Sequence, residues 1–198
     1  MAEFFESIIM HPRLWLSVHL LGVCVGLGGA TVTDILFFKF LKDFRISRKE
    51  ADIMHTLSLA IVAALFVIFI SGIALYLLDT AKYSASPAFM TKMIIVMILT
   101  FNGFVLHQYV SPKLVRLSFS EERGLTQRFR SLRHLAFALG AVSATSWYFT
   151  FFLATLKSVI TDSTQAHHLL GLYGVIVFGA LLASQYMEYS LQRSAAGE

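Results

Sequence analysis

The chain has 198 residues, of which 57% are hydrophobic and only 14% are charged, and its formal net charge is +4. Soluble domains carry roughly 25% charged residues, so the composition excludes a water-soluble protein and predicts one embedded in a lipid bilayer. The basic residues lie beside apolar segments, where they orient membrane proteins and contact anionic lipid. We therefore exclude a nucleic-acid partner.

Five apolar segments are each long enough to cross a hydrocarbon core of about 30 Å as a helix, at a rise of about 1.5 Å per residue. They are 14–38, 53–78, 88–110, 132–156 and 167–189. Only helices and closed barrels satisfy all backbone polar groups within lipid. The sequence therefore predicts an all-α fold, a single transmembrane domain over residues 1–198 that forms a bundle of five transmembrane helices.

The first segment is too long for the core of a cleavable signal peptide and lacks a basic leader, so we expect a retained helix. His19 lies five residues inside this segment, and four glycines follow it: Gly22, Gly26, Gly28 and Gly29. The spacing of Gly22 and Gly26 lets another helix approach the backbone closely. A flat ligand is the alternative occupant of the same space.

The links between the segments predict the orientation. Twelve basic residues fall on one side of the membrane: Lys39, Lys42, Arg45, Arg48, Lys49, Lys113, Arg116, Arg123, Arg128, Arg130, Arg133 and Arg193. Arg13, Lys82, Lys92 and Lys157 fall on the other. Because cytoplasmic loops are enriched in Lys and Arg, we expect the N-terminus outside and the C-terminus in the cytoplasm. The links at 84–87 and 161–165 are predicted to be short turns.

This orientation sorts six histidines by depth. His19, His167 and His168 fall near the outer face, whereas His55, His107 and His134 fall near the inner face. Ionisable side chains within a membrane are costly and mark functional sites, and imidazole is a common axial ligand of haem iron. The alternative for a histidine close to the surface is contact with lipid headgroups.

We therefore expect one or two haem b groups. The outer haem would be bound by His19 and His168, with His167 as the other candidate of its doublet, and two of the three inner histidines would bind a second haem. Trp147, in the outer half of the fourth segment, would line the outer pocket, although aromatic residues there also serve as membrane-belt and packing residues. Asn102 in the third segment is expected to form a hydrogen bond across helices.

Two segments carry a resemblance. The run from His19 through Gly22, Gly26, Gly28 and Gly29 resembles the first helix of copper-resistance D-type membrane proteins and bacterial membrane protoporphyrinogen oxidases. The helix led by Lys92 is similar to the lysine-led helix of the same group. The resemblance implies that His19 and Lys92 serve haem binding and activity. The chain differs from the group at Gly26, where a tryptophan is expected, and at Asn102, where the oxidases place a histidine.

These features predict a multi-pass cytochrome b of the bacterial inner membrane that transfers electrons, with a quinone or a redox protein as partner. One alternative is a haem-dependent membrane oxidase of a porphyrinogen-like substrate, in which Lys92 takes part. A copper-handling protein is the other alternative, since imidazole and thioether groups both bind copper. It would use the histidines together with Met54, Met90 and Met93.

Overall fold

The computed structural model describes residues 11–41, 47–110, 127–156 and 165–195. Within these ranges the chain is helical over 95% of its residues and contains no strand. The all-α prediction is therefore confirmed. All but the last residue of the predicted link at 161–165 lies outside the described residues. The same is true of several basic link residues, Lys42, Arg45, Lys113, Arg116, Arg123 and Lys157 among them.

The described elements are seven helices: α2 (Pro12–Leu41), α3 (Arg48–Leu78), α4 (Thr80–Ser84), α5 (Pro87–Val105), the π-helical turn η1 (Leu106–Val110), α7 (Gln127–Thr155) and α8 (Ala166–Ala195). Five candidate spans are long and apolar enough to cross a membrane: Pro12–Phe37, Arg48–Leu78, Pro87–Val110, Ser131–Thr155 and Ala166–Ser190. They match the five predicted segments to within a few residues at all but one end. The exception is the start of the second span, which lies five residues earlier than predicted.

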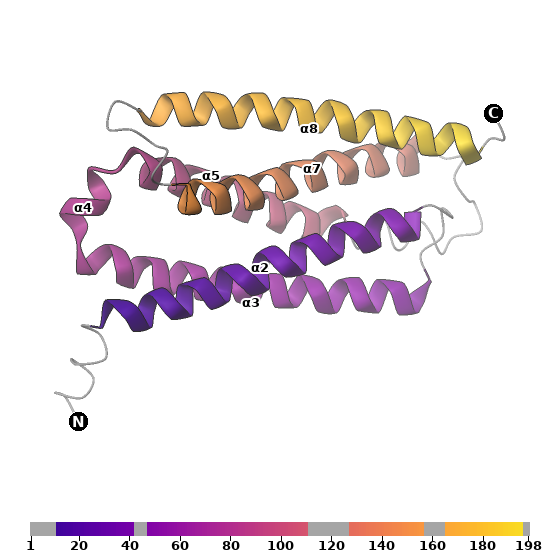
Figure 1. Ribbon diagram of the computed structural model, residues 1–198. Helices are drawn as coiled ribbons and strands as arrows, with labels where there is room; N and C mark the ends of the chain where they lie inside the picture. Colours follow the sequence, from indigo (N-terminus) through magenta and orange to yellow (C-terminus); the bar gives the residue numbers. More distant parts are fainter. Residues whose placement is uncertain (1–10, 42–46, 111–126, 157–164, 196–198) are drawn as a thin grey trace.

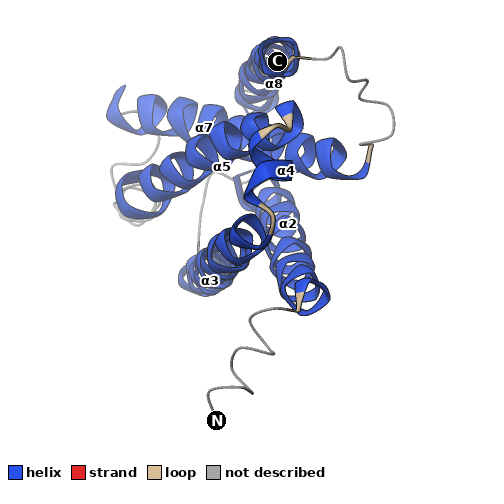
Figure 2. Ribbon diagram, turned by 90° about the vertical axis from the view of Figure 1, so that its left-hand side faces the viewer, coloured by secondary structure: helices blue, strands red, loops and turns tan. Residues whose placement is uncertain are grey.

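The long helices lie side by side and form an elongated bundle (Figure 1). Helix α2 packs along α3, and α7 contacts α2, α5 and α8. Viewed along the bundle, α2 and α3 form one pair, and α8 lies on the far side of α5 and α7 from that pair (Figure 2). We call the two ends of the bundle the α4 end and the η1 end, after the short element found at each. His19 is near the α4 end, and His55 is near the η1 end.

Helix starts are fixed by local hydrogen bonds. Helix α3 begins with a capping box, in which the Ser47 hydroxyl accepts from the Glu50 backbone N–H and the Glu50 carboxylate accepts from the Ser47 N–H at 2.7 Å. At α5, Ser86 is the capping residue and Pro87 occupies the first turn, where a missing N–H costs nothing. The Asp79 side chain caps α4 by accepting from the Lys82 N–H. The link at 84–87 is thus a turn, as predicted, but a short helix that was not predicted precedes it.

Small clusters of buried apolar residues hold the bundle together. The central one comprises Ala30, Ile68, Leu99 and Trp147, contributed by four helices. Most other large apolar side chains are exposed on the outer surface, Leu21, Phe66 and Phe101 among them. A soluble protein rarely exposes so much contiguous apolar surface, whereas a lipid bilayer covers it. The structure thus agrees with a bilayer environment.

Polar groups also join the helices. The Asn102 side-chain amide donates to the Leu139 carbonyl at 3.0 Å, which confirms the predicted bond across helices. The hydroxyls of Ser146 and Tyr173 lie 2.8 Å apart and link α7 to α8.

Candidate functional site

His19 is held against α3 near the α4 end of the bundle. Its Nδ1 lies 3.0 Å from the Ser71 hydroxyl oxygen, and Ser71 is fully buried. The Ser71 hydroxyl also lies 2.6 Å from the Val67 carbonyl and 3.2 Å from the Ile68 carbonyl. In the arrangement in which this hydroxyl donates to a carbonyl, it accepts from His19, so that Nδ1 carries the ring hydrogen and Nε2 keeps its lone pair. Imidazoles that bind metals in proteins have this arrangement, in which the second nitrogen donates to a fixed acceptor.

Two features surround His19: the backbone of α3 and the charge of Lys92. A methyl group added to Gly72 would lie 3.6 Å from His19 Cε1, so the ring lies against the backbone of α3. The positive charge of Lys92, on α5, acts electrostatically on His19. The two residues that carry the family resemblance thus lie at the same end of the bundle.

A second pair of imidazoles lies at the η1 end. His55, in the second turn of α3, and His107, in η1, have ring centroids 5.9 Å apart and ring planes inclined by 27°. His55 is exposed and His107 is half-buried. His107 lies in a π-helical turn, an element that is rare and frequently found at functional sites. Of the three inner histidines, these two come together.

His134 belongs to a different group of side chains, between α7 and α8. Its Nδ1 contacts the Glu188 carboxylate and lies 3.1 Å from the Gln185 side-chain oxygen. Glu188 is 1% exposed and also accepts from Arg133 Nε at 2.7 Å. We call Arg133, His134, Gln185 and Glu188 the buried charge cluster. It lies at the η1 end, and its histidine is partly exposed.

His167 and His168 open α8 with exposed side chains whose ring centroids are 4.1 Å apart. His168 Nδ1 accepts a long hydrogen bond of 3.4 Å from the Gln165 N–H. Helix α8 packs on α7 and α5, whereas His19 packs against α3. The contacts described for His19 and for the doublet therefore do not bring them together, and their joint role as outer ligands stays a prediction.

The glycines of α2 serve close packing. A Cβ on Gly26 would lie 2.3 Å from Cη2 of Trp147, which is 5% exposed, so the indole ring occupies the space beside this glycine. A Cβ on Gly22 would lie 2.9 Å from the side chain of Ile68, and one on Gly29 would lie 3.0 Å from that of Ile61. The sequence left a neighbouring helix or a flat ligand as the alternatives, and the structure places side chains of neighbouring helices beside these three glycines. The space beside Gly28 is open.

The sequence did not predict a role for two of these residues, Glu188 and Ser71. Glu188 is an acidic residue inside the fifth predicted span, and its position alone marks it as a candidate. Ser71 carries no such signal, because small polar residues are common in membrane helices and nothing in the sequence pairs this one with His19.

Among the described residues, no group of three or more His, Cys, Asp or Glu side chains is arranged to bind a metal ion. Comparisons of the chain with protein-family models, curated proteins and solved structures found no match.

Proposed function

We propose that the protein is a b-type haem protein of the membrane that transfers electrons. The observation that carries this proposal is the pair formed by His55 and His107, two imidazoles supplied by different helices with ring centroids 5.9 Å apart. A haem iron needs no more than two ligands from the protein, because the porphyrin supplies the others. A zinc ion needs three or four.

The separation of the two rings fits one iron between them. Each metal–nitrogen bond is about 2 Å long, so the two nitrogens lie about 4 Å apart and the ring centroids roughly 6 Å apart. Bound haem would supply a one-electron carrier whose potential depends on its ligands and burial. The histidines would hold it at the η1 end, within reach of the membrane surface.

His19 supports a second haem at the α4 end. Its Nδ1 is engaged by Ser71 at 3.0 Å, which leaves Nε2 as the ligand atom and fixes the orientation of the ring. His168 is the proposed second ligand and Trp147 a proposed pocket residue, although Trp147 now packs on Gly26. Two haems at opposite ends of the bundle would form a path for electrons across the bilayer.

The proposed location is the bacterial inner membrane. The distribution of Lys and Arg supports an N-terminus outside and a C-terminus in the cytoplasm, so the η1 end would face the cytoplasm. The proposed partner is a quinone or a redox protein.

The test is the optical spectrum and the haem content of protein purified from haem-replete cells. We expect a Soret band, and we expect His55→Ala and His107→Ala each to remove about one haem per chain. His11→Ala is the matched control, because His11 is exposed and precedes the first span. A colourless preparation contradicts the proposal, and haem content unchanged in both variants contradicts the assignment of this pair.

A second candidate function is a haem-dependent oxidase of a porphyrinogen-like substrate. The observation in its favour is that Lys92 acts electrostatically on His19, and these are the two residues that the resemblance links to activity. A direct assay of porphyrinogen oxidation distinguishes the two functions, since a haem-loaded but inactive protein leaves only electron transfer. The copper-handling alternative stays a prediction from the sequence.

A further inference from the structure

A small cavity opens at the α4 end of the bundle, between α4, the start of α5 and the end of α7. Its volume is about 60 Å³, and its described lining consists of Lys82, Tyr83, Ser86, Ala88, Phe89, Lys92, Leu153 and Ala154. A single water needs roughly 10–15 Å³ measured in this way. The cavity therefore has room for several waters, or for a compact group such as a phosphate.

The charged side chains that line this cavity are positive. Lys82 and Lys92 both line it, whereas the Asp79 carboxylate, which accepts from the Lys82 N–H at 3.2 Å, is not part of the described lining. Helix α5 begins at Pro87, so the positively polarised N-terminus of a 19-residue helix lies at the same place. Three positive features that converge on one cavity favour an anionic occupant.

Much of the remaining wall of the cavity is apolar. Phe89, Leu153 and Ala154 contribute to it, and the Phe89 ring is stacked on Tyr76 at a centroid distance of 5.5 Å. The candidate span that contains α5 starts at Pro87, and the candidate span within α7 ends at Thr155. The cavity therefore lies where these spans meet water, at the depth of lipid headgroups.

We propose that this cavity binds the phosphate of an anionic membrane lipid. Lys82 and Lys92 would contact the phosphate oxygens, and the lipid chains would lie along the exposed apolar surface of the neighbouring spans. Inorganic phosphate shares the same charged chemistry, but it cannot use the apolar wall. A lysine near the membrane surface contributes enough attraction to an anionic lipid to change its affinity about fivefold.

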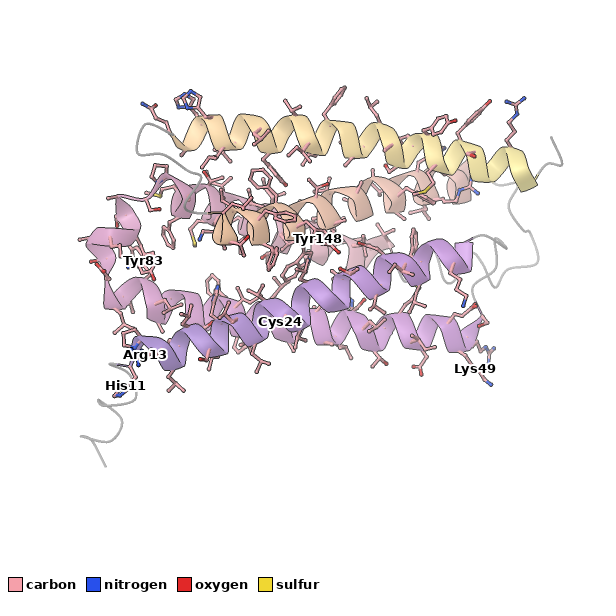
Figure 3. The ribbon with its side chains drawn as sticks, viewed as in Figure 1. His11, Arg13, Cys24, Lys49, Tyr83 and Tyr148 are labelled. Atoms are coloured by element: carbon pink, nitrogen blue, oxygen red, sulfur yellow. The ribbon has the colours of Figure 1, made fainter. Side chains whose placement is uncertain are left out.

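The test compares three probes on the detergent-purified full chain: short-chain phosphatidylglycerol, phosphatidylcholine of the same chain length, and inorganic phosphate. Binding is measured by native mass spectrometry and by the rise in thermal midpoint. We expect phosphatidylglycerol to bind best, and Lys82→Gln and Lys92→Gln each to weaken it about fivefold. Lys49→Gln is the matched control, because this exposed lysine lies at the opposite end of the bundle from Tyr83 (Figure 3).

Four results would overturn the proposal. Equal binding of phosphatidylcholine would show that the negative charge is not recognised, and equal protection by inorganic phosphate would replace the lipid with a free anion. An unchanged affinity for phosphatidylglycerol in the Lys82→Gln, Lys92→Gln double variant, or an equal loss in Lys49→Gln, would place the lipid elsewhere. None of these readouts depends on bound haem.

Discussion

The ion pair between Arg133 and Glu188 gives a prediction whose size follows from the geometry. The two side chains are 8% and 1% exposed, and Arg133 Nε lies 2.7 Å from Glu188 Oε1. At an effective dielectric constant of about 20, the attraction at this distance is about 6 kcal/mol. Desolvation of both charges offsets much of that attraction, but removal of one partner leaves the other charge buried. Glu188→Gln should therefore destabilise the fold by about 3–5 kcal/mol.

The assay is the unfolding of detergent-purified protein, followed by tryptophan fluorescence. The Arg133→Met, Glu188→Met double variant should regain most of the lost stability, because it leaves no buried charge unpaired. Asp52→Asn is the matched control, since this carboxylate is exposed near the same end of the bundle and should change stability by no more than about 0.5 kcal/mol. The reasoning is refuted if Glu188→Gln costs no more than the control, or if the double variant is less stable than either single variant.

Three further predictions concern contacts between helices. Gly26→Ala places a Cβ 2.3 Å from Trp147 Cη2 and should lower the free energy of unfolding by about 1–3 kcal/mol. In the Trp147→Phe background this loss should be smaller, and an unchanged loss would contradict the contact. Asn102→Leu removes the hydrogen bond to a carbonyl of α7 and should cost about 1 kcal/mol in the same assay, whereas no loss would mean that water replaces the bond. If the second haem is present, Ser71→Ala should weaken haem binding at His19 about 10–100-fold in a haem titration, because the imidazole loses its hydrogen-bond acceptor. The Ser71→Thr variant keeps the hydroxyl and should bind haem as the wild type does.

The spans were predictable because apolar composition reflects contact with lipid. The predicted segment 53–78 and the end of α3 at Leu78 agree. The start of α3 was missed by five residues, because it depends on the capping box between Ser47 and Glu50 and not on hydropathy. Similarly, α4 is too short and too polar to register as an apolar segment, and its start depends on the hydrogen bonds that Asp79 accepts from the backbone of Lys82 and Tyr83.

The partners of the histidines were harder to predict than their depth. Distance along a helix follows directly from residue number, which grouped His55, His107 and His134 at one end of the bundle. Which side chains face each other depends on the rotation of each helix and on the order of helices around the bundle. The structure pairs His55 with His107 and directs His134 to Glu188 on α8. The π-helical turn adds a further rotation at His107 that no periodicity in the sequence indicates.

Helix α3 connects the two proposed haem sites, and its contact with α2 determines the geometry of the outer one. Ser71 and His55 are sixteen residues apart on α3, about 24 Å along the helix axis, so this helix supplies one residue to each site. His19 reaches Ser71 only because α2 lies close to α3, and Gly22 and Gly29 allow that approach: a Cβ on either would lie no more than 3.0 Å from an isoleucine of α3. The glycines thus serve the proposed site through packing. A larger residue at Gly22, one turn from His19, would push the helices apart and lengthen the 3.0 Å hydrogen bond that fixes the imidazole.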